Sequence, residues 1–221
     1  MDIEVNIQEI HRRIARACER SHRLPGEITL VAVAKGFDAS AVRAAFDCGM
    51  RDFGENRVQE AEKKIAQLSD LKPDITWHMV GHLQSNKART AAELFDIIHS
   101  VDSVRLAGIL SQRAEQTLPV LLEVNVSGET SKSGFAADEI AGAVEEVRQL
   151  PNLEVMGLMT IAPLTANPED IRPVFRKLRE LRDYLGLEQL SMGMTDDFEV
   201  AVEEGATVLR IGRAIFGDRR S

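Results

Sequence analysis

The feature that most constrains this chain is a regular alternation of short β-rich runs with stretches of helical periodicity. The runs are ITLVAVAK ending at Lys35, DFGEN near Asn56, TWHMVG near Gly81, DIIHSV near Val101, PVLLEVNV near Val126, LEVMGLMT near Thr160, QLSMGM near Met194 and TVLRIG ending at Gly212. Residues 39–47, 58–68, 86–94, 103–116, 138–150, 168–185 and 196–204 separate the runs and have the length and apolar spacing of helices. A further amphipathic helix is expected over residues 6–20, ahead of the first run.

This alternation predicts an α/β fold with a parallel sheet, because parallel strands need a crossover connection between them. The count of eight favours a closed (β/α)8 TIM barrel, with the N-terminal helix as an extra element. An open doubly wound sheet is the alternative, but KGFDAS follows the first run in place of a glycine-rich dinucleotide fingerprint. Apolar residues make up 44% of the chain and no linker-like stretch interrupts it, so residues 1–221 are expected to form a single domain.

Charge, hydropathy and cysteine content argue against several classes of protein. The formal net charge is −8 and the basic residues are dispersed, which disfavours binding to nucleic acid. No window approaches the roughly 20 apolar residues of a membrane span, and Cys18 and Cys48 lack metal-like spacing. His78 and His82 fall on a predicted strand and turn, so they would not share a helical face as zinc ligands do. We therefore expect a cytoplasmic protein with reduced thiols and no metal.

Polar residues gather at the predicted carboxyl ends of the strands, where barrel enzymes place their active sites. They are Lys35, Asn56, His82, Asn125, Thr160, Ser191 and Arg210, with Gly193 and Gly212 allowing a ligand close to the backbone. Asparagines at such positions either hydrogen-bond a ligand or tie loops together.

Among these polar strand-end residues, Lys35 and Arg210 are the two cations that lie in or at the end of an apolar run. Burial at the barrel mouth would lower the pKa of Lys35 and favour the neutral amine that a Schiff base requires; the alternative is a lysine that reaches out to water. Arg210 lies on the inner face of its strand and needs an acceptor, either a ligand atom or an internal carboxylate.

The segment Ser191 to Gly217 contains a second kind of signal, a possible phosphate cradle. Ser191 and Gly193 end one run, and the amides around Gly212 and Arg213 follow the next, so hydroxyl and N–H donors converge. An ordinary turn with a serine cap is the alternative.

Six blocks of this sequence resemble the pyridoxal phosphate homeostasis protein family, also called the YggS/PROSC family. The blocks are LVAVAK, FGENRVQE, WHMVGHLQSNK, EVNVSGETSKSGF, EVMGLMTIAP and SMGMTDDFEVAVEEGATVLRIGRAIFG, in the family's order and spacing. Departures occur at Ala34 and Gly36, where the family more often has serine and threonine, and at Thr195, where it has serine.

The resemblance implies a barrel similar to the N-terminal domain of alanine racemase, holding pyridoxal 5'-phosphate (PLP) as a Schiff base on Lys35. It further implies that Ser191, Gly212 and Arg213 bind the phosphate, that Arg210 faces the pyridine nitrogen, and that Asn56 lines the cofactor.

Within this resemblance the family role is PLP binding and homeostasis, affecting vitamin B6 and amino-acid balance, with no catalytic residues and no turnover. In racemases a tyrosine from an additional domain supplies a second base, whereas the only tyrosine here, Tyr184, falls in a predicted outer helix. A low-activity PLP-dependent racemase is the alternative. A third possibility is a regulatory partner protein whose PLP occupancy is read by another macromolecule through the SGETSKSGF loop, with Lys132 and Gly134; a solvated connector is the plainer interpretation of that loop. The family suggests a monomer, with apo PLP enzymes as candidate partners.

Overall fold

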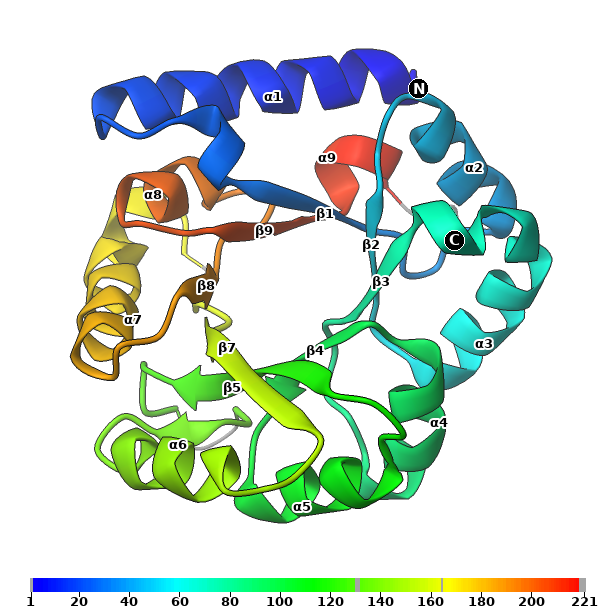
Figure 1. Ribbon diagram of the computed structural model, residues 1–221. Coiled ribbons are helices and arrows are strands. Elements are labelled where there is room, and N and C mark those ends of the chain that lie inside the picture. Colours follow the sequence, from blue (N-terminus) through cyan, green and yellow to red (C-terminus); the bar gives the residue numbers. More distant parts are fainter. Residues whose placement is uncertain (1, 130–131, 164, 219–221) are drawn as a thin grey trace.

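Eight parallel strands close into a barrel in the computed structural model, which describes residues 2–129, 132–163 and 165–218 (Figure 1). The strands are β1 (Thr29–Val33), β2 (Asp52–Glu55), β3 (Thr76–Met79), β4 (Ile97–Val101), β5 (Leu118–Asn125), β7 (Leu153–Met159), β8 (Gln189–Ser191) and β9 (Val208–Ile211). Their order is β4-β3-β2-β1-β9-β8-β7-β5, and pairing of β4 with β5 closes the ring. The predicted TIM barrel is confirmed, and the open sheet is excluded.

Strand register divides the strand residues between two environments. Val31 pairs with Arg210 in parallel register, so both side chains lie on the same face, and Leu30 pairs with Leu209 on the other. Leu30 and Leu209 belong to the large apolar cluster between barrel and helices. A separate small cluster comprises Val31, Val33, Val80 and Val208. The barrel interior is therefore only partly apolar, and polar side chains fill the rest.

Helices cover the outside of the barrel, as parallel strands with two buried faces require. They are α2 (Ala39–Asp47), α3 (Val58–Gln67), α4 (Ala88–Leu94), α5 (Val104–Arg113), α6 (Ile140–Arg148), α7 (Arg172–Tyr184) and α8 (Phe198–Glu203), with the short α9 (Arg213–Phe216) after β9. Short 3-10 helices occupy Pro25–Glu27, Ser69–Asp74, Ser85–Lys87 and Pro168–Ile171. None of the described helices is long and apolar enough to cross a membrane.

The N-terminal helix α1 (Ile3–Arg20) occupies the place of a long eighth outer helix. The helix after β9 has only four residues, and α1 packs against α8, α9 and α2 beside it (Figure 1). Asn6 Nδ2 donates a hydrogen bond to the carbonyl of Ile215 at 2.8 Å, which joins α1 to α9. The apolar face of α1, including Ile10, is buried. The extra helix thus completes the layer around the barrel.

Several element boundaries differ from prediction, and one short strand is additional. Helix α1 begins before residue 6 because the Asp2 carboxylate accepts hydrogen bonds from the amides of Glu4 and Val5. Strand β8 ends at Ser191 and not near Met194, because Gly193 has φ of 95° and turns the backbone. A two-residue strand, β6 (Phe135–Ala136), pairs with the end of β5 outside the eight-stranded ring. Two residues carry too little periodicity to be predicted.

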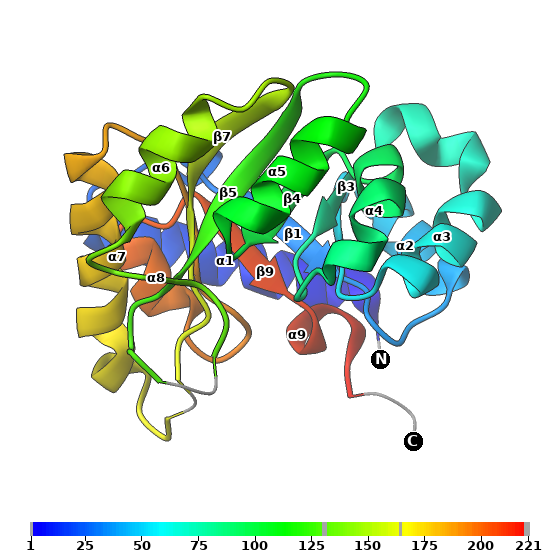
Figure 2. The ribbon, with the colours of Figure 1, turned by 90° about the horizontal axis from the view of Figure 1, so that it is seen from below.

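Figure 2 shows α9 and the connections that follow β5 and β7 on one side of the barrel. This is the side of the carboxyl strand ends, because each of these segments follows its strand directly. Lys35, Asn56 and Gly212 each follow a strand and therefore lie on this side of the barrel.

Candidate functional site

The sheet order makes neighbours of four strand ends that are far apart in sequence. Strands β2, β1, β9 and β8 are adjacent in that order. Asn56 follows β2, Lys35 lies two residues after β1, Ser191 ends β8 and Gly212 follows β9. Predicted site residues from both ends of the chain therefore converge on one arc of the barrel mouth.

Lys35 occupies a tight turn after β1. The amide of Phe37 donates to the carbonyl of Ala34 at 3.1 Å, and Gly36 has φ of 77° at the third position of the turn. A positive φ there is what a type II turn requires, and glycine adopts it without strain. The turn places Lys35 at the barrel mouth with its side chain half-buried.

A buried ion pair holds the turns that bear Lys35 and Asn56. Lys64 of α3 pairs with Glu55, and its Nζ donates to the Ala34 carbonyl at 2.7 Å. Both side chains are buried, and the second carboxylate oxygen of Glu55, Oε2, has no hydrogen-bond partner. Burial raises the pKa of Glu55, and the positive charge of Lys64 opposes this effect. Because Ala34 precedes Lys35 and Glu55 precedes Asn56, one pair fixes both strand ends.

Arg210 is buried inside the barrel with two acceptors of its own. Its guanidinium donates to Ser191 Oγ at 2.6 Å and to the Thr160 carbonyl at 2.8 Å. Burial lowers the pKa of Arg210 to about 10, against the nearby charges of Glu123 and Asp197, so it stays protonated at neutral pH. No carboxylate in the described ranges forms an ion pair with Arg210. The acceptor that the sequence requires is thus a hydroxyl and a carbonyl within the protein.

Ser191 faces the barrel interior. Its side chain is fully buried, and its Oγ lies 2.8 Å from His99 Nδ1 as well as contacting Arg210. Strand pairing of Ser191 with Val208, an interior residue, explains this orientation. The hydroxyl therefore holds Arg210 in place, and its predicted contact with a phosphate stays a prediction.

The start of α9 contributes the donors of the predicted phosphate cradle. Gly212 is the N-cap of α9, and a Cβ there would lie 2.9 Å from the Val33 carbonyl, which restricts the position to glycine. The first amides of a helix have no intrahelical partner and favour an anion. The side chain of Arg213, the first residue of α9, pairs with Asp196 at the surface.

Thr195 lies beside the predicted cradle, and reasoning from the strand ends missed it. Its Oγ1 accepts a weak hydrogen bond from the amide of Ala214 at 3.4 Å, which places the hydroxyl at the start of α9. The available signal was its position in the SMGMT block, where the resembling family has serine.

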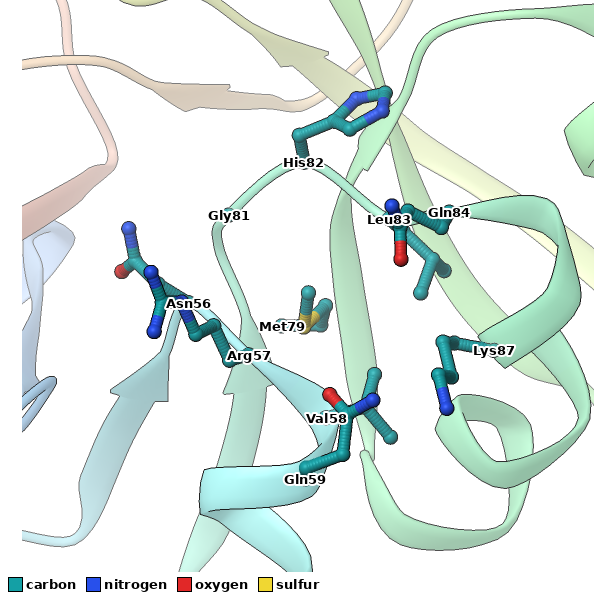
Figure 3. Close-up of a pocket in the computed structure, with 10 residues that line it drawn as sticks. All are labelled: Asn56, Arg57, Val58, Gln59, Met79, Gly81, His82, Leu83, Gln84 and Lys87. Atoms are coloured by element: carbon teal, nitrogen blue, oxygen red, sulfur yellow. The ribbon is translucent and has the colours of Figure 1, made fainter.

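A pocket of about 400 Å³ adjoins the arc between the ends of β2 and β3 (Figure 3). Asn56 and Arg57 extend on one side of it, and Gln84 and Lys87 lie on the other (Figure 3). Asn56 is the only predicted cofactor residue among those that line the pocket. The pocket therefore borders the predicted site and does not contain it.

Other polar strand-end residues have structural partners. Asn125 donates to the Glu129 carbonyl at 2.8 Å and ties down the loop after β5, while the exposed His82 pairs with Asp102 at 3.2 Å. The described side chains include no group of three or more metal-ligating residues.

The donors along this arc have the chemistry that a phosphorylated ring aldehyde would require. An amine can react with an aldehyde, a guanidinium can donate to a ring nitrogen, and a helix start with a hydroxyl can hold a phosphate. Lys35, Arg210 and the turn of Thr195 with α9 supply these groups in that order.

Comparison with known proteins gives consistent results over nearly the whole chain. Residues 5–220 match the model of the alanine racemase N-terminal domain. A pyridoxal phosphate homeostasis protein of Pseudomonas aeruginosa is 48% identical over 98% of this chain and 96% of its own. PipY of Synechococcus elongatus PCC7942, solved with PLP bound, is 40% identical, with a TM-score of 0.81 over 92% of this chain and 100% of its own.

Alanine racemase from Corynebacterium glutamicum shares the fold alone, with 18% identity and a TM-score of 0.70 over 100% of this chain and 62% of its own. The sequence blocks, the closed barrel and the long matches at high identity agree. The chain belongs to the pyridoxal phosphate homeostasis protein family, which is built on the fold of the alanine racemase N-terminal domain.

Proposed function

We propose that this chain binds PLP at the carboxyl ends of β2, β1, β9 and β8 and acts as a noncatalytic carrier and buffer of it. The observation that carries the proposal is the sheet order, which makes neighbours of the ends bearing Lys35, Asn56 and Gly212. PipY, a relative solved with PLP bound, supports the choice of ligand. On this proposal, residues 1–221 work as one PLP-binding barrel domain that affects vitamin B6 and amino-acid balance.

Lys35 is proposed to hold the cofactor covalently. Its neutral amine adds to the aldehyde carbon of PLP, and water leaves as the Schiff base forms, so no oxidant or reductant is needed. Asn56, at the next strand end, is proposed to line the cofactor ring. The half-buried position of Lys35, directly after β1, supports this role.

The phosphate is proposed to bind at the start of α9. The amides of Gly212 and Arg213 point to the helix N-terminus, where an anion is favoured. Thr195 is proposed to add its hydroxyl to this cradle. Ser191 is proposed to act on the cofactor through Arg210, because both partners of its hydroxyl lie in the barrel interior.

Two features of the site support binding without turnover. PLP supplies an electron sink to an attached amino acid, and that sink is strongest when its ring nitrogen is protonated. Arg210 remains a cation and can only donate, so facing this nitrogen it would keep it unprotonated. Tyr184, the single tyrosine, is 81% exposed on α7 and is remote from the barrel mouth. No tyrosine is thus available as a second base.

Absorption spectroscopy of the PLP-loaded protein tests the proposal. We expect a band at the visible edge that Lys35→Ala abolishes, because the amine that forms the Schiff base is removed. Lys72→Ala is the control, since Lys72 is exposed in the 3-10 helix ahead of β3, at the opposite end of the strands. An unchanged band in Lys35→Ala would refute the assignment of the lysine.

A PLP-dependent racemase of low activity is the second candidate, favoured by the match to the alanine racemase domain. Deuterium exchange at the α-carbon of amino acids in D2O separates the two. Exchange at enzymatic rates that requires Lys35 would favour catalysis, and no exchange across a panel of amino acids would favour the carrier.

Apo PLP enzymes are the proposed recipients of the cofactor, with a regulatory protein as the alternative partner, and the protein is proposed to work as a cytoplasmic monomer. Lys132 pairs with Glu129 at 2.9 Å and donates to the Ile161 carbonyl beside the barrel mouth. Thr130 and Ser131 of the same loop lie outside the described residues. Size-exclusion chromatography with and without a recipient apoenzyme tests the monomer and the complex.

A further inference from the structure

A continuous chain of hydrogen-bonding side chains crosses the interior of the barrel. His78 Nε2 lies 3.0 Å from Asp52 Oδ1, and His78 Nδ1 lies 2.9 Å from His99 Nε2. His99 Nδ1 lies 2.8 Å from Ser191 Oγ, which accepts from Arg210 at 2.6 Å. Four neighbouring or facing strands, β2, β3, β4 and β8, contribute one member each before β9 supplies Arg210.

The chain links the two ends of the barrel. Asp52 is the first residue of β2, and 30% of its side chain is exposed at the amino-end side. Ser191 is the last residue of β8, at the carboxyl-end side, and is fully buried. His78 and His99 between them are buried as well. A solvent-accessible acid is therefore connected to a buried arginine through side chains alone.

With neutral imidazoles between them, the two terminal groups fix the direction of every bond of this network. A guanidinium only donates, and a carboxylate only accepts. If both imidazoles are neutral, each has one donor and one acceptor, so that His78 donates from Nε2 to Asp52 and accepts at Nδ1 from His99 Nε2–H. His99 then accepts at Nδ1 from the Ser191 hydroxyl. That leaves the lone pairs of Ser191 to accept from Arg210.

This arrangement satisfies both buried imidazoles without a buried charge between the ends. Burial, together with the positive charge of Arg210 and the neighbouring His78, lowers the pKa of His99 well below 6.5, in keeping with its neutral form. A protonated His99 imidazole would have two donors, and the hydrogen bond to one of its two neighbours would have to reverse its direction. The hydroxyl of Ser191 would then lose its acceptor in His99.

We propose that Asp52, His78 and His99 are positioning residues that orient the Ser191 hydroxyl and, through it, the guanidinium of Arg210. The inference rests on the proposed function for its link to PLP, because it takes Arg210 as the group that faces the ring nitrogen. The donor and acceptor directions of these hydrogen bonds are a property of the protein without ligand.

The ligand-free protein gives the first test. Long-range 1H–15N spectra of protein labelled at histidine distinguish protonated from unprotonated ring nitrogens. We expect both His78 and His99 as neutral rings protonated at Nε2, and we expect Asp52→Ala to remove this preference at His78. A ring protonated at Nδ1 in the unmodified protein, or spectra unchanged by Asp52→Ala, would overturn the proposal.

The PLP-loaded protein gives the second test, in which the substituted residue lies far from the proposed cofactor site. We expect Asp52→Ala to weaken PLP retention about fivefold to tenfold, as loss of one buried hydrogen bond would, although Asp52 lies at the other end of the barrel. Asp52→Asn keeps an acceptor oxygen without the charge, and we expect a smaller loss. Asp96→Ala is the matched control. Asp96 accepts a hydrogen bond from the Trp77 amide at 2.7 Å on the same side of the barrel, and it is not a member of the hydrogen-bonded series from Asp52 to Arg210.

The two proposals fail differently. A parent protein that shows no Lys35-dependent band when PLP is added would reject PLP binding, and the conclusions from the histidine spectra would still hold. A parent protein that keeps its band, with equal PLP retention in Asp52→Ala and Asp96→Ala, would reject the positioning role alone.

Discussion

At the scale of single residues, a buried lysine outside the predicted set joins two strand ends of the proposed site. Lys64 is buried on α3, yet it holds the carbonyl before Lys35 and the carboxylate before Asn56. Such a pair contributes little net stability over apolar residues of the same shape, but removing one partner leaves a buried charge uncompensated. Its value here is that it fixes two strand ends relative to each other.

Lys64→Met should therefore destabilise the fold by about 3 kcal/mol at neutral pH. The pKa of Glu55 is raised already by burial and rises further once Lys64 is gone, so the group carries its proton over a wider range. Since a protonated Glu55 costs less to bury, the deficit should shrink as the pH falls. Urea unfolding at two pH values measures this, with the exposed neighbour Lys63→Met as control. Equal losses in both variants would contradict the buried pair.

At the scale of elements, the N-terminal helix takes over a position that the repeating β-α pattern leaves incomplete. The helix after β9 is too short to cover the barrel, and α1 lies alongside it. Its sequence periodicity already indicates an apolar face, with Ile7, Ile10 and Ile14 at helical spacing. What that face covers depends on the closure of the barrel.

Ile10→Ala on α1 should cost about 3 kcal/mol in the free energy of unfolding, because a side chain that is 2% exposed is replaced by a cavity. Val5→Ala on the same helix is the control, since Val5 is 57% exposed. Denaturant unfolding of both variants measures the difference. If the two substitutions cost the same, α1 is not an integral part of the outer layer.

At the scale of the whole molecule, a partly polar barrel interior makes stability depend on pH. The pKa of His99 lies well below its ordinary value of 6.5, chiefly through burial. Below pH 6.5, His99 therefore binds a proton in the unfolded chain but not in the folded protein. The contribution of His99 is complete above pH 6.5 and is lost as the pH falls below it, by at most about 1.4 kcal/mol per pH unit.

His99→Gln should flatten the fall of unfolding free energy between pH 6.5 and the acid range, whatever its effect on absolute stability. Glu55, Glu123 and Asp197 have raised pKa values, which give the opposite slope, so the difference between variants is the quantity to measure. His11→Gln, at an exposed histidine of α1, is the control. A slope unchanged in His99→Gln would show that His99 binds its proton alike in both states.

Much of this molecule can be predicted from local patterns in the sequence. The eight apolar runs and their helices follow from residue type and spacing, because a strand or helix is mostly specified by neighbours along the chain. Lys35, Asn56 and Gly212 were predicted at carboxyl strand ends for the same reason. The end of β8 was misplaced, since the turn at Gly193 depends on a backbone angle that the residues around it do not specify.

The sequence by itself determined the fold class, the family and the set of polar strand ends. Only the tertiary structure decided that the Ser191 side chain faces Arg210 and His99 in the barrel interior. It also decided that Asp52, His78 and His99 are joined by hydrogen bonds in one series. The physical reason is that hydrogen bonds between strands depend on the sheet order and the register of a closed barrel. Those contacts join residues as far apart as Asp52 and Arg210, and no local periodicity records them.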